Sequence, residues 1–349
     1  MLRAARGRGA EGRGRCGAAG EDLIITRYED LHHHPAVFES MTGLRLTEFD
    51  AVLTALLPRY QVAEVVRLSQ PTKRRPVRQR AIGAGNTFAL DVRDQLLLTV
   101  VWLRVYPTYP VLGYLFGVST GAVERVLPRV LPLLEQLGQA SLDRALVALD
   151  DPARRLRQRS RRHLDDVLRD VPALAVVIDT FEQRVQRPQG YTEGGTRVAD
   201  GFYSGKKKQH TLKTQVAVDE ETGRFVDMPD SVPGPTADLT VLKNSGLLGR
   251  LPPDVGGLGD KAYIGGDQLV PDVVVATPRR KPRGQPRPPE DVTYNTAFAR
   301  RRIVVEHSIG RLRRYQALSQ TDRHRRGHRG RTRAVAGLVN RQIQRRFPF

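Results

Sequence analysis

The sequence predicts an α/β or α+β fold, with a mixed sheet of about five strands and flanking helices behind an all-helical front end. Between residues 44 and 150, apolar side chains recur at helical spacing. From residue 173 onward, short apolar runs alternate with turn residues, which is typical of strands. Residues 151–172 are strongly charged, and we expect them to connect the two parts.

The chain has 349 residues, the usual length of two domains. We expect five segments: a low-complexity basic leader, a helical domain, a charged connector, a sheet domain and a basic tail with a short helix. Their expected bounds are 1–43, 44–150, 151–172, 173–320 and 321–349. No stretch approaches the roughly 18 consecutive apolar residues that span a bilayer. We therefore expect no membrane partner and a cytoplasmic location.

The charge balance is strongly basic, with 57 Lys and Arg against 37 Asp and Glu and a net charge of +20. Such an excess indicates a polyanionic partner, and nucleic acid is the first candidate. There is one cysteine, Cys16, so a disulfide framework and a multi-cysteine zinc module are both excluded.

The front end begins with two predicted helices. The first covers Thr47–Leu57, with Thr47 as its cap and Pro58 just past its end. A basic, proline-broken linker follows at residues 70–80. The second helix covers Asp91–Tyr106, and the prolines after it force a break.

A more specific pattern lies at residues 110–127, where a short apolar helix leads through Phe-Gly-Val-Ser into a second helix. Two helices joined by a tight turn predict a helix-turn-helix. Its second helix would be capped by Ser119 or Thr120 and would present Ser119, Thr120 and Arg125 to a DNA groove. An ordinary helical hairpin is the alternative.

The second part of the chain reads as strands and helices in alternation. Its most hydrophobic strand, Val176–Ile178, is expected to end at Asp179. The further expected elements are strands at 212–218, 224–228, 255–258 and 273–276, a hairpin turn at 219–223, helices at 238–248 and 295–314, and a basic proline-rich loop at 278–289.

Three acidic residues stand apart from the rest. Asp179 and Asp260 each follow a short apolar strand, and Glu306 lies in the last long helix at the margin of its apolar face. Carboxylates from two strand ends and one helix suit a pair of Mg²⁺ ions, which prefer hard oxygen ligands. Two such ions activate an attacking oxygen and stabilise the leaving oxygen of a phosphodiester. The alternative is that each acid caps a helix or pairs with an arginine.

Four motifs together resemble the DDE transposases of insertion sequences, in the group whose DDE superfamily endonuclease domain follows its own helix-turn-helix. They are FGVSTGAVERVLPRVLP at 116–132, YSGKKKQHTLK at 203–213, GDKAYIG at 259–265 and RRIVVEHSIGRLRRY at 301–315. The resemblance implies an RNase H-like sheet domain, with Asp179, Asp260 and Glu306 as metal-binding catalytic carboxylates. It adds Asp238 as a further metal-binding acid, and two Mg²⁺ ions, with Mn²⁺ as a substitute.

Two positions depart from the family pattern. Ala237 stands where the family usually has a histidine before the acid at 238. In the first motif, Phe181 stands at a position that is usually small and polar, although Glu182 and the Arg187-Pro188 pair remain.

Two groups of cations are expected to contact DNA. The first lies close to the strand after Asp179, and we expect positions 206, 208 and 210 to share one face. The second flanks Glu306 on its helix. A solvated basic turn and a solvated helix face are the alternatives. The residues concerned are Lys206, Lys207, Lys208, His210 and Lys213 in the first group, and Arg302 and Arg313 in the second.

The sequence therefore predicts a metal-dependent DNA endonuclease and strand transferase, that is, a transposase. Its partners would be double-stranded DNA, at the transposon ends and at the target, and further copies of itself on that DNA. One alternative is a DNA-binding protein derived from a transposase and no longer catalytic. Another is a hydrolytic endonuclease without strand transfer.

Overall fold

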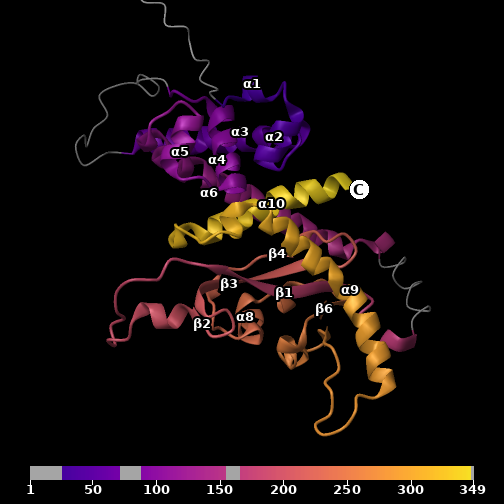
Figure 1. Cartoon of the computed structure of the whole chain (residues 1–349). Helices are drawn as coiled ribbons and strands as arrows, with labels where there is room; N and C mark the ends of the chain where they lie inside the picture. The colour runs from indigo at the N-terminus through magenta and orange to yellow at the C-terminus, as the bar shows by residue number, and fades with distance from the viewer. Residues whose placement is uncertain (1–25, 71–87, 155–165, 347–349) are drawn as a thin grey trace, which may run out of the picture.

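The computed structural model describes residues 26–70, 88–154 and 166–346. The leader up to residue 25, the linker from residue 71 and the connector residues 155–165 lie outside these ranges. The described part opens with a helical region (Figure 1), whose helices are α1 (Tyr28–Leu31), α2 (Pro35–Thr42), α3 (Leu46–Ser69), α4 (Val92–Val105), α5 (Tyr109–Leu115) and α6 (Thr120–Val147).

Two expectations for the start of the chain are wrong. The leader was expected to reach residue 43, but α1 and α2 fold within it and Phe38 is fully buried. The first long helix was expected to stop before Pro58, but α3 runs through that proline to Ser69. Beyond the proline, Tyr60 is buried and its hydroxyl donates to Gln95 Oε1 at 3.1 Å. A proline inside a helix removes one backbone hydrogen bond, and this packing compensates for the loss.

Helices α4, α5 and α6 follow the sequence pattern closely. Asp91 caps α4 by accepting from the Asp94 amide at 2.7 Å, and Tyr106 ends it in the left-handed conformation. A tight turn then separates α5 from α6. Ser119 caps α6 by accepting from the Ala122 amide at 3.2 Å. The expected cap of the second helix of the motif is therefore confirmed.

The rest of the chain forms a mixed sheet with flanking helices. In the described residues the sheet has seven strands in the order β2-β3-β1-β6-β7, with β4 and β5 also paired to β3. β1 is antiparallel to β3 and parallel to β6, and β6 is parallel to β7. The strands are β1 (Leu174–Arg184), β2 (Tyr203–Ser204), β3 (Gln209–Asp219), β4 (Phe225–Asp227), β5 (Val232–Pro233), β6 (Val255–Leu258) and β7 (Val275–Ala276).

Strand β1 corrects another expectation, because it does not end at Asp179 but continues to Arg184. Its parallel partner β6 stops earlier, and the last pair joins Val177 to Leu258. Asp179 therefore lies beyond the end of the parallel pairing, although it lies inside its own strand. The main helices in this part of the chain are α8 (Asp238–Ser245), α9 (Pro289–Arg313) and α10 (His328–Arg346).

The two faces of the sheet have separate cores. On one face, Val177, Phe181 and Val218 join the apolar side chains of α9, α10 and the whole helical region in one cluster. On the other face, Val176 and Ile178 pack with α8 and the short turns after β6. Because the helical region and the sheet share a core, they are packed together as one body. No helix among the described residues is long and apolar enough to cross a membrane.

The C-terminal segment is not the basic tail with a short helix that the sequence suggested. Helix α10 covers residues 328–346 and lies between the helical region and the sheet (Figure 1). Arg331 on this helix is almost fully buried and pairs with the equally buried Asp322. A charge pattern that reads as solvated thus contains a buried ion pair, which the Tyr106 hydroxyl of the helical region approaches at 3.4 Å.

Helices α6 and α10 touch through glycines. A Cβ at Gly138 would lie 2.0 Å from the Arg333 carbonyl oxygen, and one at Gly337 would lie 2.6 Å from the Gly138 Cα. Both distances are far below van der Waals contact. The backbones therefore approach closely at this crossing, and neither position has room for a side chain.

We predict that Gly138→Ala lowers the free energy of unfolding by about 3 kcal/mol or more, because the added methyl group forces the two backbones apart. Gly310→Ala is the control, since a Cβ there meets nothing within 4 Å and alanine favours a helix. Urea denaturation of both variants checks this. Equal stability of the two variants would show that α6 and α10 adjust without cost.

A buried hydrogen-bonded chain ties α10 to the sheet through His328. Its Nδ1 lies 2.8 Å from Ser231 Oγ, which in turn lies 2.7 Å from Thr214 Oγ1. Its Nε2 lies 2.8 Å from Gln183 Oε1, while Gln183 Nε2 donates to the Ala317 carbonyl. Since Gln183 Oε1 can only accept, Nε2 of the imidazole carries a proton and donates it to this oxygen.

Burial lowers the pKa of His328 from 6.5 to about 4. The unfolded chain therefore binds one more proton than the folded chain between these values, and stability falls as the pH drops through this window. The loss reaches about 3 kcal/mol near pH 4. His328→Gln should remove that part of the pH dependence, as measured by urea denaturation at pH 7 and pH 5. An unchanged pH profile in the variant would contradict this assignment.

Candidate active site

Two of the predicted carboxylates lie at neighbouring strands of the sheet. Asp179 on β1 lies just past the Val177–Leu258 pair, and Asp260 follows β6 after one residue. Asp260 caps a short turn by accepting from the Ala262 amide at 2.8 Å. The parallel direction of β1 and β6 thus brings both carboxylates to the same edge.

Asp238 lies at the same edge of the sheet, on the face where α8 packs. It begins α8, and its Oδ1 accepts from Thr180 Oγ1 at 3.2 Å. The same oxygen lies 2.7 Å from Lys213 Nζ, which also donates to the Thr236 carbonyl at 2.6 Å. Asp238 is therefore held beside Asp179 by contacts to two strands of the sheet.

Asp179 lies in an environment with opposing electrostatic effects. Burial raises its pKa, and the nearby charges of Asp260 and Asp238 raise it further. The Thr180 amide, which donates to Oδ1 at 2.7 Å, and the Arg302 guanidinium, 3.4 Å from Oδ2, both lower it. Arg302 belongs to α9, so this ion pair joins the last long helix to the strand that carries the acid.

Tyr263 is a site residue that the sequence reasoning missed. Its side chain is fully buried and its hydroxyl has no hydrogen-bond partner among the described residues. Burial and the charges of Asp238, Asp179 and Asp260 raise its pKa, in that order. The charges of these three carboxylates thus act on a hydroxyl that has no hydrogen-bond partner among the described residues. The position in the GDKAYIG motif was the available signal, but a tyrosine there reads equally well as core.

Glu306 does not join the aspartates directly. It is exposed on α9, one helical turn beyond Arg302. Within the described ranges, no three His, Cys, Asp or Glu side chains lie close enough to form a metal site. Glu306 and Arg302 belong to the same helix, and Arg302 pairs with Asp179. This pair is the connection between the helix that carries Glu306 and the aspartates.

The predicted DNA-contacting cations fall into different environments. Lys206, Lys207 and Lys208 are exposed, but they form the turn between β2 and β3, so the expected sharing of one strand face is wrong. His210 is half-buried and contacts the Tyr203 ring edge-on. Lys213 is buried and bonded to Asp238, which leaves it no free face for a phosphate.

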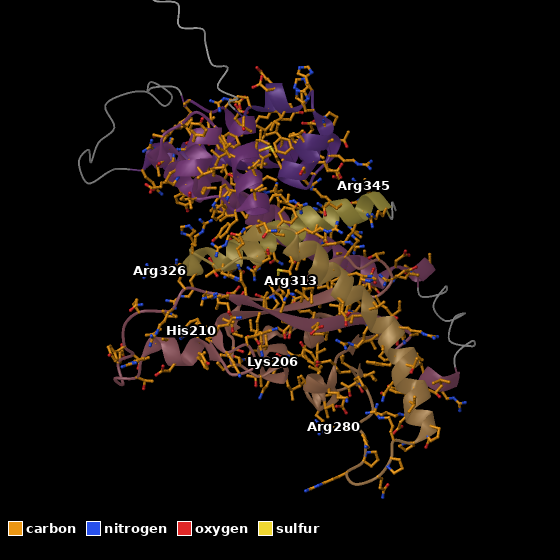
Figure 2. The ribbon with its side chains drawn as sticks, viewed as in Figure 1. Lys206, His210, Arg280, Arg313, Arg326 and Arg345 are labelled. Carbon is orange, nitrogen blue, oxygen red and sulfur yellow. The ribbon has the colours of Figure 1, made fainter. Side chains whose placement is uncertain are left out.

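The remaining predicted contacts lie on two helices. Arg302 is half-buried against Asp179, whereas Arg313 is exposed near the end of α9 (Figure 2). At the start of α6, Ser119 and Arg125 are exposed and Thr120 is half-buried. The first turn of α6 can therefore reach a DNA groove.

Two family models match the chain. Residues 178–340 match the DDE superfamily endonuclease, and residues 88–140 match the helix-turn-helix of DDE superfamily endonuclease. A protein named as the probable transposase for insertion sequence element IS702, from Microchaete diplosiphon, is 27% identical over 307 residues, covering 88% of this chain and 94% of that protein. The chain belongs to the DDE superfamily of insertion-sequence transposases.

Membership of the DDE superfamily confirms the resemblance drawn from the motifs, and the helix-turn-helix match covers α4, α5 and most of α6. No solved structure matches the chain. The nuclease-type match begins at Ile178, beside the first aspartate, and ends within α10. The C-terminal helix is therefore part of the family domain.

The two departures from the family pattern have simple structural settings. Phe181 is buried on β1, on the same strand face as Asp179, and belongs to the core that α9 covers. Ala237 lies at the N-cap of α8, where its side chain makes no capping bond. Phe181 thus fills a position of the transposase core, and Ala237 leaves the start of α8 without a side-chain cap.

We predict that Tyr263→Phe leaves the free energy of unfolding within about 1 kcal/mol of the parent, because its hydroxyl makes no hydrogen bond among the described residues. Tyr315→Phe is the matched control. Tyr315 is also fully buried, but its hydroxyl accepts from Gln342 Nε2 at 3.2 Å, so this variant should be less stable by about 1 kcal/mol. Urea denaturation measures both; a greater effect of Tyr263→Phe would reveal a structural partner for its hydroxyl.

Proposed function

We propose that the chain is an active DNA transposase, which cuts at the ends of its element and transfers the freed strand to target DNA. The observation that carries this proposal is that Asp179 and Asp260 lie at the same edge of the sheet, on and just after the parallel strands β1 and β6, with Asp238 bonded to Thr180 beside Asp179. The family assignment and the net charge of +20 support it. We further propose that several copies assemble on DNA, because two ends must be joined together.

We also propose that the sheet domain is RNase H-like. The strand order supports this, since three antiparallel strands, β4, β3 and β1, continue into the parallel strands β6 and β7. A helix, α8, lies between the antiparallel and parallel strands, and α9 follows the last strand. In this arrangement the acids lie at the point where β1 extends past β6.

The chemistry of the residues fits divalent cations, although their present spacing does not form a finished site. Asp179, Asp238 and Asp260 lie at one edge of the sheet, and protein cations, Arg302 and Lys213, neutralise two of them. Mg²⁺ prefers such hard oxygen ligands and keeps several waters. Asp179, Asp260, Glu306 and Asp238 would hold two Mg²⁺ ions, or Mn²⁺ in their place. When bound, these ions would polarise the attacking oxygen and stabilise the leaving oxygen.

The residues of the chain would divide the remaining work. The first turn of α6 would read the transposon end, with Ser119, Thr120 and Arg125 facing the groove. Water then attacks the phosphorus at the end of the element, and the bond from phosphorus to the 3′ oxygen breaks to leave a free 3′ hydroxyl. That hydroxyl attacks a target phosphodiester in line and displaces its 3′ oxygen. Arg302 lowers the pKa of Asp179 and so favours the charged form of this carboxylate.

The test uses the purified protein, Mg²⁺ and a labelled duplex that carries the terminal repeats of the element. We expect Asp179→Asn and Glu306→Gln each to lower cleavage at least about 100-fold, the scale on which removal of a transition-state group is felt. Binding to the duplex should persist in both variants. Glu290→Gln is the control, because Glu290 is an exposed glutamate at the start of the same helix.

Each other outcome would contradict a different part of the proposal. Binding without cleavage by the parent would indicate a non-catalytic DNA-binding protein. Cleavage without joined products would indicate a hydrolytic endonuclease. Equal cleavage by the parent and by Glu306→Gln would remove Glu306 from the site.

A further inference from the structure

The basic loop between β7 and α9 begins at the same sheet edge as the acids. β7 is parallel to β6, with Ala276 paired to Leu258. The Gly259 amide, one residue before Asp260, donates to the Ala276 carbonyl at 3.0 Å. The chain then leaves the sheet as the loop of residues 277–288, which carries five cationic residues and no acidic one.

The base of this loop is fixed on α9. Asn295 accepts from the Arg279 amide at 2.8 Å and donates to the Arg279 carbonyl at 3.1 Å. The Arg279 guanidinium pairs with Asp291 at 3.2 Å and lies over the Tyr294 ring, 4.3 Å from its centroid. Arg279 thus has a structural role, because its contacts fix the start of the loop against α9.

The cations beyond this anchor are presented to solvent. Arg280, Lys281 and Arg283 are exposed, and none has an acidic partner in the described part of the chain. Beside them, a groove on α9 is lined by Arg287 and Arg300 together with Val292, Thr296, Ala299 and Ile303. The Nε of Arg287 is buried without a hydrogen-bond partner among the described residues. Unpaired guanidinium groups along a groove suit the phosphates of a nucleic acid.

The groove leads towards the proposed active site. Thr296, Ala299 and Ile303 follow one another at helical spacing, and Glu306 continues the same stripe of α9. The loop lies at the end of the molecule opposite the helical region, with the sheet between them, and Arg280 extends there into solvent (Figures 1 and 2). The loop and the helix-turn-helix thus lie on opposite sides of the sheet that carries the acids.

We propose that the loop of residues 277–288 and the neighbouring groove on α9 hold duplex DNA beyond the cleavage point. That DNA is the donor flank before cutting and the target during strand transfer. This inference rests on the proposed function and adds the path of its second DNA segment. Contacts made by exposed Arg and Lys to phosphates are independent of base sequence, which suits a segment that differs at each insertion.

The test compares the full-length parent with Arg280→Gln/Lys281→Gln/Arg283→Gln, without metal so that no cleavage occurs. Three labelled duplexes are used: a terminal repeat ending at the cut, the same repeat with added flank, and an unrelated sequence. We expect the triple variant to bind the pre-cut repeat within twofold of the parent but to bind the flanked and unrelated duplexes about tenfold more weakly. For these two duplexes, the slope of log affinity against log salt concentration should become shallower by about 0.9 for each phosphate that the variant leaves without a cation.

The control variant is Arg280→Lys/Arg283→Lys, which keeps the charge and should bind all three duplexes as the parent does. Equal weakening on the pre-cut and flanked repeats would overturn the inference, because the loop would then hold the transposon end. Unchanged binding to the flank would overturn it as well. A parent that binds the repeat no better than the unrelated duplex would instead contradict the proposed function.

Discussion

The close approach of α6 and α10 at Gly138 and Gly337 is the constraint on which the rest of the structure depends. These two glycines let one helix backbone rest on the other, where any side chain would clash. Because α10 also packs on the sheet through His328, the same crossing places the helical region over the sheet and encloses a single core between them. The DNA-reading helices and the acids are therefore held in one fixed relation.

At the acid edge, the main physical problem is the cost of gathering negative charge in a partly buried place. Lys213 compensates the negative charge of Asp238, and Arg302 compensates that of Asp179. Asp260 instead accepts a hydrogen bond from a backbone amide. Each acid thus has a partner of its own, which keeps the edge stable before any ligand arrives. Glu306 lies on α9, and the pairing of Arg302 on the same helix with Asp179 determines how close Glu306 comes to the aspartates.

The sequence was sufficient where a local pattern decides the structure. The apolar run before Asp260 predicted correctly that this acid follows a strand, and the Phe-Gly-Val-Ser turn located the helix-turn-helix. It was insufficient where distant packing overrides local preference. Pro58 looked like a helix end, yet Tyr60 packs beyond it. The arginine-rich C-terminal segment was expected to be a basic tail with a short helix, yet it forms the long and largely buried helix α10. The pairing of Lys213 with Asp238 depends on the register of β3 and could not be predicted from spacing.

Helix α6 connects the helix-turn-helix mechanically to the sheet. It begins at the turn of the helix-turn-helix, and it also contacts β4. At about 1.5 Å per residue, its 28 residues form a strut of roughly 42 Å. Under the proposed function, this helix would set the distance between the terminal repeat and the cleavage point. One residue added to it would turn the reading head by about 100° about the helix axis while advancing it by only about 1.5 Å. Under the proposed function, the length of α6 would therefore set the rotational position of the element's end relative to the acids.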